Sequence, residues 1–231
     1  MKEIRDDKRK QRILDSPGFR RYFTDRYDPF ASLYRADQGE KILRQEEENH
    51  RIYYLVSGRC KVTFLQPNGK SVLLNILVPG DLIGEIELLE DIRCFSVDAL
   101  EDLVLVSLRK DEVTALLNDD PHFLRELSCS ISRKERNDIY RLLHALTYPL
   151  ENRLAKFILD YAEGDRFSIR KTLISESLCV SYRHTEKVMK DFTDQGILDK
   201  KNASTGSWTG MRWNGSLVNL RTASNCSGSS G

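Results

Sequence analysis

The sequence predicts an α+β protein in which a β jelly-roll, a long helix and a helix-turn-helix follow one another. Between residues 33 and 108, short apolar segments alternate with turn residues and give about eight closely spaced strands, which is typical of a jelly-roll or a barrel. After Pro121 nothing breaks a helix until Pro149. Residues 174–198 then contain two short helical patterns separated by a tight turn.

The first pattern includes a strong hairpin signal. The apolar runs CKVTFL and KSVLLNIL flank QPNGK, in which Asn68 and Gly69 readily adopt positive φ angles. Gly58 and the Pro79–Asp81 cluster fall between other runs, so strands and turns alternate. We therefore expect an all-β domain over residues 28–120.

The second pattern is a helix with an apolar seam that charge interrupts near its middle. One interpretation is packing onto its own domain, and the other, which we favour, is a two-stranded coiled coil. The residues near the a and d positions, and hence the predicted dimer interface, are Leu124, Leu127, Ile131, Asp138, Leu142 and Ala145.

The third pattern predicts DNA binding. In a helix-turn-helix the second helix enters the major groove with its first residues towards base edges. Ser181 suits an N-cap that also touches phosphate, and Arg183 can give guanine a bidentate contact. The alternative is a plain helical hairpin with a solvated basic face. The predicted DNA-binding residues are Ser181, Tyr182, Arg183, His184, Glu186, Lys187 and Lys190.

Composition fits a soluble globular protein whose basic last third suits either a polyanionic partner or a solvated surface. The 231 residues are 40% apolar and 31% charged, without a membrane-length apolar run and with a charged N-terminus, so we expect a cytoplasmic protein without a membrane partner. Residues 1–27 contain 9 basic (Lys, Arg) and 5 acidic (Asp, Glu) side chains. Residues 28–120 contain 10 basic and 18 acidic, and residues 121–231 contain 17 basic and 12 acidic. The basic last third is where a nucleic acid would bind.

Catalytic and metal chemistry are not indicated. The cysteines stand singly, which favours buried thiols over a disulfide or zinc framework. Of the four histidines only His50 lies near the barrel, whereas a cupin-type metal site needs two or three on neighbouring strands. Neither a catalytic triad, a P-loop nor a dinucleotide-binding motif occurs, so we expect no enzyme and no required cofactor. The cysteines are Cys60, Cys94, Cys129, Cys179 and Cys226.

Taken in order, these features resemble the Crp/Fnr superfamily of bacterial transcription regulators over residues 33 to about 200. The segments IGEIEL (83–88) and VSYRH (180–184) resemble the YeiL-like members. The resemblance implies a cyclic-nucleotide-binding-type effector domain, a homodimer joined through the long helix, and a winged helix-turn-helix. It also implies a palindromic site on double-stranded DNA and RNA polymerase as a partner.

Residues 81–97 carry the superfamily's candidate effector pocket. In members that bind cyclic AMP, a glycine, a glutamate, an arginine and then a Ser or Thr hold the nucleotide, and the resemblance assigns these places to Gly84, Glu85, Arg93 and Cys94. The loop before Arg93 is two residues shorter, Cys94 replaces the hydroxyl, and Glu87 replaces a small residue. A carboxylate there would repel phosphate. Cyclic AMP is therefore possible but disfavoured, and Glu85 and Arg93 could instead form an internal ion pair.

Two features depart from the superfamily near the end of the chain. Cys179 occupies a turn where glycine is common, so the turn must avoid positive φ or carry strain. From residue 203 the sequence is rich in Gly and Ser, which puts a β-hairpin wing in doubt. These features leave a second hypothesis, a ligand-sensing or interaction protein that has lost DNA binding.

The patterns and the resemblance together divide the chain into five parts. These are an N-terminal helical segment (1–27), whose apolar residues suit packing on the barrel, a β-roll effector domain (28–120), a dimerisation helix (121–148), a helix-turn-helix DNA-binding domain (149–202) and an atypical tail (203–231).

Overall fold

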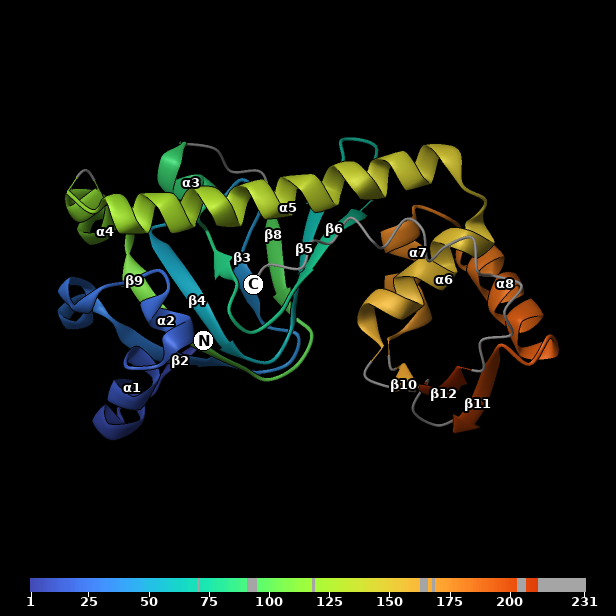
Figure 1. Cartoon of the computed structure of the whole chain (residues 1–231), viewed down its shortest axis with the longest axis horizontal. Helices are drawn as coiled ribbons and strands as arrows, with labels where there is room; N and C mark the ends of the chain where they lie inside the picture. Colours follow the sequence, from blue (N-terminus) through green and yellow to red (C-terminus); the bar gives the residue numbers. More distant parts are fainter. Residues whose placement is uncertain are drawn as a thin grey trace. The chain divides into compact units, whose positions relative to one another are not determined.

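The computed structural model of the chain describes residues 1–69, 71–90, 95–117, 119–162, 166–167, 169–202 and 207–211. It divides into two compact units, residues 1–139 and 140–231, and each is considered by itself (Figure 1). The long helix α5 (Pro121–Thr147) begins in the first unit and ends in the second.

The first unit is a β-roll of two antiparallel sheets, as predicted. The larger sheet has the order β1-β2-β9-β4-β7 and the smaller has the order β3-β8-β5-β6. The strands are β1 (Lys2–Glu3), β2 (Ser32–Ala36), β3 (Lys41–Leu43), β4 (Arg51–Ser57), β5 (Cys60–Leu65), β6 (Ser71–Leu77), β7 (Leu82–Ile83), β8 (Ser96–Ala99) and β9 (Leu103–Arg109). The expected eight-stranded roll corresponds to β2–β9.

The hairpin predicted around QPNGK is confirmed. Strand β5 pairs with β6, and Leu65 lies opposite Ser71. Gly69 has φ +80°, and its N–H donates to the carbonyl of Gln66 at 2.9 Å. Asn68 keeps a negative φ, so only the glycine of the expected pair adopts the left-handed conformation.

The central strands β4 and β9 are apolar on both faces. Ile52 and Tyr54 point into one core cluster, whereas Tyr53 and Leu55 point into a second cluster between the sheets. Successive side chains of a strand point to opposite faces, so a strand covered on both sides becomes a continuous apolar run. This explains the unalternating sequence RIYYLV.

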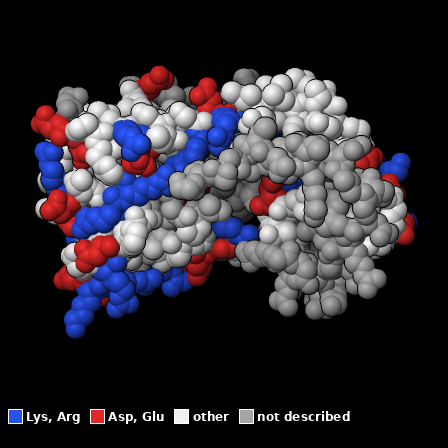
Figure 2. Space-filling model, in the orientation of Figure 1, with Lys and Arg blue, Asp and Glu red and all other residues white. Residues whose placement is uncertain are grey.

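The N-terminal segment packs against the roll, as expected from its apolar residues. It forms α1 (Asp7–Leu14), α2 (Pro17–Arg20) and the 3-10 helix η1 (Asp25–Phe30). Phe23 stacks on Phe19 at 4.9 Å between ring centroids and on Phe123 of α5 at 5.1 Å. The solvent face of α1 is basic, and Figure 2 shows Lys and Arg side chains gathered in the corner where Figure 1 places this helix.

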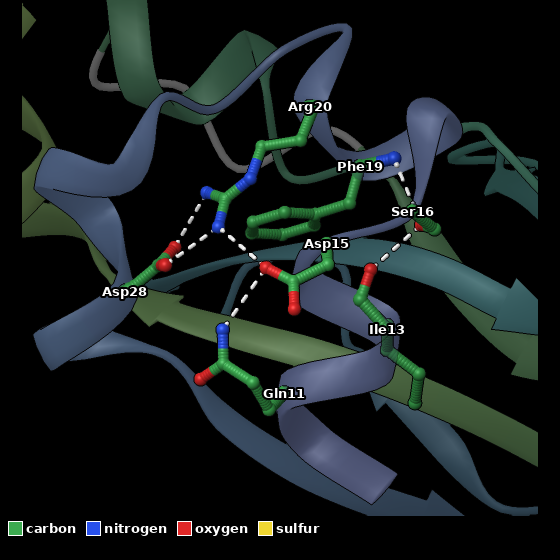
Figure 3. A network of polar contacts seen from close by, with 7 residues as sticks. All are labelled: Gln11, Ile13, Asp15, Ser16, Phe19, Arg20 and Asp28. Carbon is green, nitrogen blue, oxygen red and sulfur yellow. Dashed lines mark hydrogen bonds and ion pairs between the residues drawn. The ribbon is translucent and has the colours of Figure 1, made fainter.

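A polar network fixes the path of this segment (Figure 3). The Arg20 guanidinium donates to both Asp28 oxygens at 2.7 and 2.6 Å and contacts Asp15 at 3.3 Å. The hydrogen bonds with Asp28 are the largest cause of a raised pKa for Arg20. Ser16 caps α2 by accepting from the Phe19 N–H. The segment is thus clamped at both ends of α2.

Three helices complete the first unit. The short helices are α3 (Ile86–Leu89) and α4 (Lys110–Leu117). Helix α5 confirms the predicted long helix to within one residue, with Asp120 accepting from the Phe123 N–H at 2.9 Å and Pro121 at the first helical position.

The structure corrects the seam predicted along α5. Leu127 is 1% exposed in the core of its own unit, and Ile131 packs partly against the same core. Leu127 and Ile131 therefore follow the packing alternative rather than the dimer seam. The other predicted interface residues differ in exposure: Leu124 is half-buried, and Asp138, Leu142 and Ala145 are exposed.

The second unit is a helix-turn-helix with a small sheet. Its helices are α6 (Leu150–Tyr161), α7 (Lys171–Leu178) and α8 (Tyr182–Asp194). Its strands β10 (Arg166–Phe167), β11 (Leu198–Asn202) and β12 (Ser207–Met211) pair in the order β10-β12-β11. Part of the atypical tail, residues 207–211, pairs with β11 as the β12 strand of a wing-like sheet, although the sequence put such a wing in doubt.

The cysteines also differ in part from the expectation of buried thiols. Cys60 is fully buried, and burial raises its pKa to about 12. Cys129 and Cys179 are exposed. Cys94 and Cys226 lie outside the described residues.

Candidate nucleic-acid interface and effector pocket

Helix α8 is amphipathic, with one buried face and one exposed face. Its buried face consists of Thr185, Val188, Met189 and Phe192, each at most 4% exposed. These positions recur at the three- and four-residue spacing of one helix face. The opposite face is therefore presented to solvent in a fixed orientation.

The turn before α8 is held by backbone and hydroxyl hydrogen bonds. Cys179 adopts φ +54° and ψ +40°, the left-handed conformation, so the turn takes the strained alternative. The Val180 N–H donates to the Ser175 carbonyl at 3.1 Å, and Ser175 Oγ lies 3.0 Å from Thr185 Oγ1. These bonds fix α7 against α8.

The predicted DNA-binding residues lie together on α8 and its cap. Ser181 is the N-cap and accepts from the His184 N–H at 3.3 Å. Glu186 pairs with Lys171 of α7 at 2.7 Å, and the Lys171 ammonium lies 6.0 Å from the Tyr182 ring centroid. All seven predicted residues are exposed: Ser181, Tyr182, Arg183, His184, Glu186, Lys187 and Lys190.

The basic residues of this surface form one stripe. Arg183, Lys187 and Lys190 are spaced four and three residues apart, so they lie on the same side of the helix. The one acidic residue among the seven already has a cationic partner. An exposed basic stripe at the start of a fixed helix is suited to phosphate and base-edge contacts.

The β-roll contains a pocket next to α3 and α5. Its lining is mostly aliphatic and aromatic, and it includes the candidate residues Gly84 and Glu85. Four charged residues also line it: Glu85, Glu87, Lys134 and Asp138.

Gly84 is required by the backbone that brings Glu85 into the pocket. It has φ +84°, and a Cβ atom there would lie 2.5 Å from Asn49 Nδ2 and 2.8 Å from the Arg51 carbonyl oxygen. Any side chain would clash and would also adopt an unfavourable conformation. The glycine therefore lets the chain turn from β7 into α3.

Glu85 pairs with a lysine of the long helix. Lys134 Nζ lies 2.5 Å from Glu85 Oε1 and also donates to the Leu82 carbonyl at 2.8 Å. The exposed fractions of the Glu85 and Lys134 side chains are 6% and 20%. The pair therefore ties α5 to the pocket wall largely out of water.

Sequence reasoning missed Lys134, although a signal for it was present. The residue stands seven positions after Leu127, where the apolar seam is interrupted by charge. Such an interruption on an otherwise packed face indicates a specific partner, which here is Glu85. Arg93 and Cys94, the other candidate effector residues, lie outside the described residues.

Glu87 is a buried carboxyl on the pocket wall. It is 7% exposed, and among the described residues it forms no ion pair. Burial raises its pKa and the nearby Glu85 carboxylate adds to that rise, whereas a backbone hydrogen bond and the cations of Lys110 and Lys134 oppose it. A phosphate in this pocket would meet the Glu87 carboxylate in addition to that of Glu85.

The described part of the chain provides neither a metal site nor a membrane-spanning helix. Its His, Cys, Asp and Glu side chains form no group of three or more that could hold a metal ion. None of its helices combines the length and the apolar character needed to cross a membrane.

Comparisons with known proteins agree with this architecture. Residues 34–120 match the cyclic nucleotide-binding domain family. The chain is 34% identical over 160 residues to the regulatory protein YeiL of Escherichia coli O157:H7, covering 69% of this chain and 73% of that protein. It is 24% identical over 170 residues to a CRP-like cAMP-activated global transcriptional regulator of Mycobacterium tuberculosis (strain H37Rv), covering 69% and 76%.

Solved structures with the same fold carry related descriptions. A putative transcriptional regulator of the Crp/Fnr family from Eubacterium rectale gives a TM-score of 0.72 at 15% identity, over 92% of this chain and 97% of that chain. The c-di-GMP responsive global regulator CLP of Xanthomonas campestris also gives 0.72, at 13% identity, over 82% and 98%. These identities show the fold alone, whereas the similarity to YeiL shows the family. The chain belongs to the Crp/Fnr family of transcription regulators.

Proposed function

We propose that this regulator binds a palindromic DNA site as a homodimer and acts on RNA polymerase in the bacterial cytoplasm. The observation that carries the proposal is the exposed basic stripe on the first turns of α8, on the side of the helix opposite its buried face. Arg183 would give guanine a bidentate contact, and Lys187 and Lys190 would contact bases or phosphates. The two recognition helices of a dimer would enter successive major grooves about 34 Å apart.

Exposed apolar residues on α5 support the homodimer. Leu142 is 60% exposed, Leu143 47% and Leu146 74%. Large apolar side chains repeated at three- and four-residue spacing on one helix are typical of a coiled-coil seam. Leu142 was predicted in that seam, whereas Leu143 and Leu146 were not.

The effector pocket is proposed to respond to something other than cyclic AMP. Support comes from Glu87, which places a buried carboxyl on the wall, and from Lys134, whose charge is already offset by Glu85. Arg93 would have to supply a phosphate's cation alone. Cyclic AMP therefore stays the disfavoured ligand.

The DNA-binding proposal is tested by selecting sequences with the purified protein and titrating variants against the selected site. Arg183→Ala should weaken binding to the selected site by about 1–3 kcal/mol. It should also relax the sequence preference at one base pair per half-site. Lys190→Ala is the matched control: it should weaken all sequences alike and reduce the salt slope by about one.

The alternative function predicts another outcome. A ligand-sensing protein that has lost DNA binding would enrich no palindrome, and Arg183→Ala would leave both affinity and salt slope unchanged. That result would contradict the proposal.

A further inference from the structure

We infer that the β-roll pocket takes a small molecule with an apolar body and a cationic amine, and that Glu87 binds the amine. The inference rests on the proposed function only in treating this ligand as the effector of DNA binding. It concerns the chemistry of the pocket, which the family relationship leaves open.

The apolar body is indicated by the pocket lining. Strands of both sheets contribute aliphatic side chains, and the segment before β8 adds Phe95. Water cannot form hydrogen bonds with such walls, so transfer of an apolar ligand group from water into the pocket would be favourable. The principal aliphatic residues are Leu43, Val62, Leu74, Leu77, Ile83 and Val97.

The cationic group is indicated by the charges that remain after pairing. Glu85 and Lys134 neutralise each other at 2.5 Å, and Asp138 is exposed on α5. Glu87 is more than nine-tenths buried and forms no ion pair among the described residues. Lys110 and Lys134 act on this carboxyl electrostatically without pairing with it. Among its described residues, the pocket therefore contains a buried carboxyl with no directly paired cation.

Burying a carboxylate without a partner is costly, and an ammonium group beside it offsets that cost. The raised pKa of Glu87 has burial as its largest cause, which agrees with this geometry. A ligand carboxylate or phosphate would add repulsion from Glu87. A neutral ligand would gain only the apolar contacts.

Four probes separate these cases by titration calorimetry with the full-length protein at pH 7.5. Phenethylamine, phenethyl alcohol and phenylacetate share one aromatic body and differ in charge, and cyclic AMP represents the family's nucleotide ligand. We expect phenethylamine to bind at least about tenfold more tightly than phenylacetate, which corresponds to about 1.4 kcal/mol.

Glu87→Gln should weaken phenethylamine binding about tenfold and leave phenethyl alcohol within about twofold. The matched control is Glu47→Gln, because the Glu47 side chain is 67% exposed and lies outside the pocket lining. This control should leave all four affinities unchanged. Thermal unfolding of both variants checks that they are folded.

Three results would overturn the inference: phenylacetate or cyclic AMP binding as tightly as phenethylamine, no saturable binding of any probe, or an amine preference that survives Glu87→Gln. The DNA selection is run separately without probe. Loss of palindrome enrichment with an intact amine preference would contradict the proposed function alone, and the converse would contradict only the inference about the pocket.

Discussion

The β-roll pocket and the α8 surface both present charged side chains from helices, but they treat those charges differently. In the pocket, the Glu85 side chain is 6% exposed and pairs with Lys134, which also holds α5 against the roll. On α8, Arg183, Lys187 and Lys190 are exposed, and the buried face is apolar apart from Thr185. The Glu85 and Lys134 charges of the pocket are therefore largely buried and paired within the fold, whereas on α8 the exposed charges and the packing residues lie on opposite faces.

This difference has a consequence for how each site can change. Under the proposed function, a new outer face on α8 would alter the DNA sequence that is recognised without disturbing the fold. A new charge in the pocket would alter ligand preference and stability together, because desolvated charges need partners.

The largest expected effect comes from the buried face of α8. Phe192 is 4% exposed, and Phe192→Ala should reduce the free energy of unfolding of the second unit by about 3–5 kcal/mol, through lost burial and a residual cavity. The measurement is chemical denaturation followed by circular dichroism. The control is Tyr182→Ala on the same helix, 45% exposed, which should change stability by at most about 0.5 kcal/mol. Equal effects would show that α8 does not separate its packing residues from its exposed residues.

An intermediate effect is expected in the pocket. Lys134→Met keeps most of the unbranched apolar side chain but removes the cation that pairs with the buried Glu85 carboxylate. The substitution should lower the free energy of unfolding by about 2 kcal/mol. The matched control is Lys187→Met on α8, which removes an exposed charge and should be near neutral for folding. It should instead weaken DNA binding. A neutral Lys134→Met variant would mean that the ion pair contributes nothing to the attachment of α5.

Much of this architecture could be predicted because it depends on local patterns. Turn residues between apolar runs predicted the β-roll, and Pro121 and Pro149 predicted the ends of the long helix. The outer face of α8 followed from its three- and four-residue spacing. In each case, neighbours in sequence determine which residues share a face.

The pocket could be predicted only in part because its charges come from distant elements. The separation between Glu85 and Lys134 is 49 residues, and their pairing depends on where α5 crosses the roll. The burial of Leu127 likewise depends on where α5 packs against the rest of its unit. The strand Ser207–Met211 was not predicted, because its Gly- and Ser-rich surroundings lack a strand pattern and its pairing with β11 cannot be read from local sequence.

The smallest expected effect lies at the turn between α7 and α8, where backbone conformation alone is at issue. Cys179 has φ +54°, a conformation that disfavours a side chain but not glycine. Cys179→Gly should therefore stabilise the second unit by about 0.5–1 kcal/mol, as part of the relieved strain is offset by the greater freedom of glycine in the unfolded chain. The same substitution at Cys129, an exposed position inside α5, should instead destabilise by about 0.3–0.5 kcal/mol. If thermal unfolding shows that Cys179→Gly raises stability and Cys129→Gly lowers it, the effect at Cys179 comes from the backbone conformation. Equal signs would mean that the thiol, rather than the left-handed turn, determines stability there.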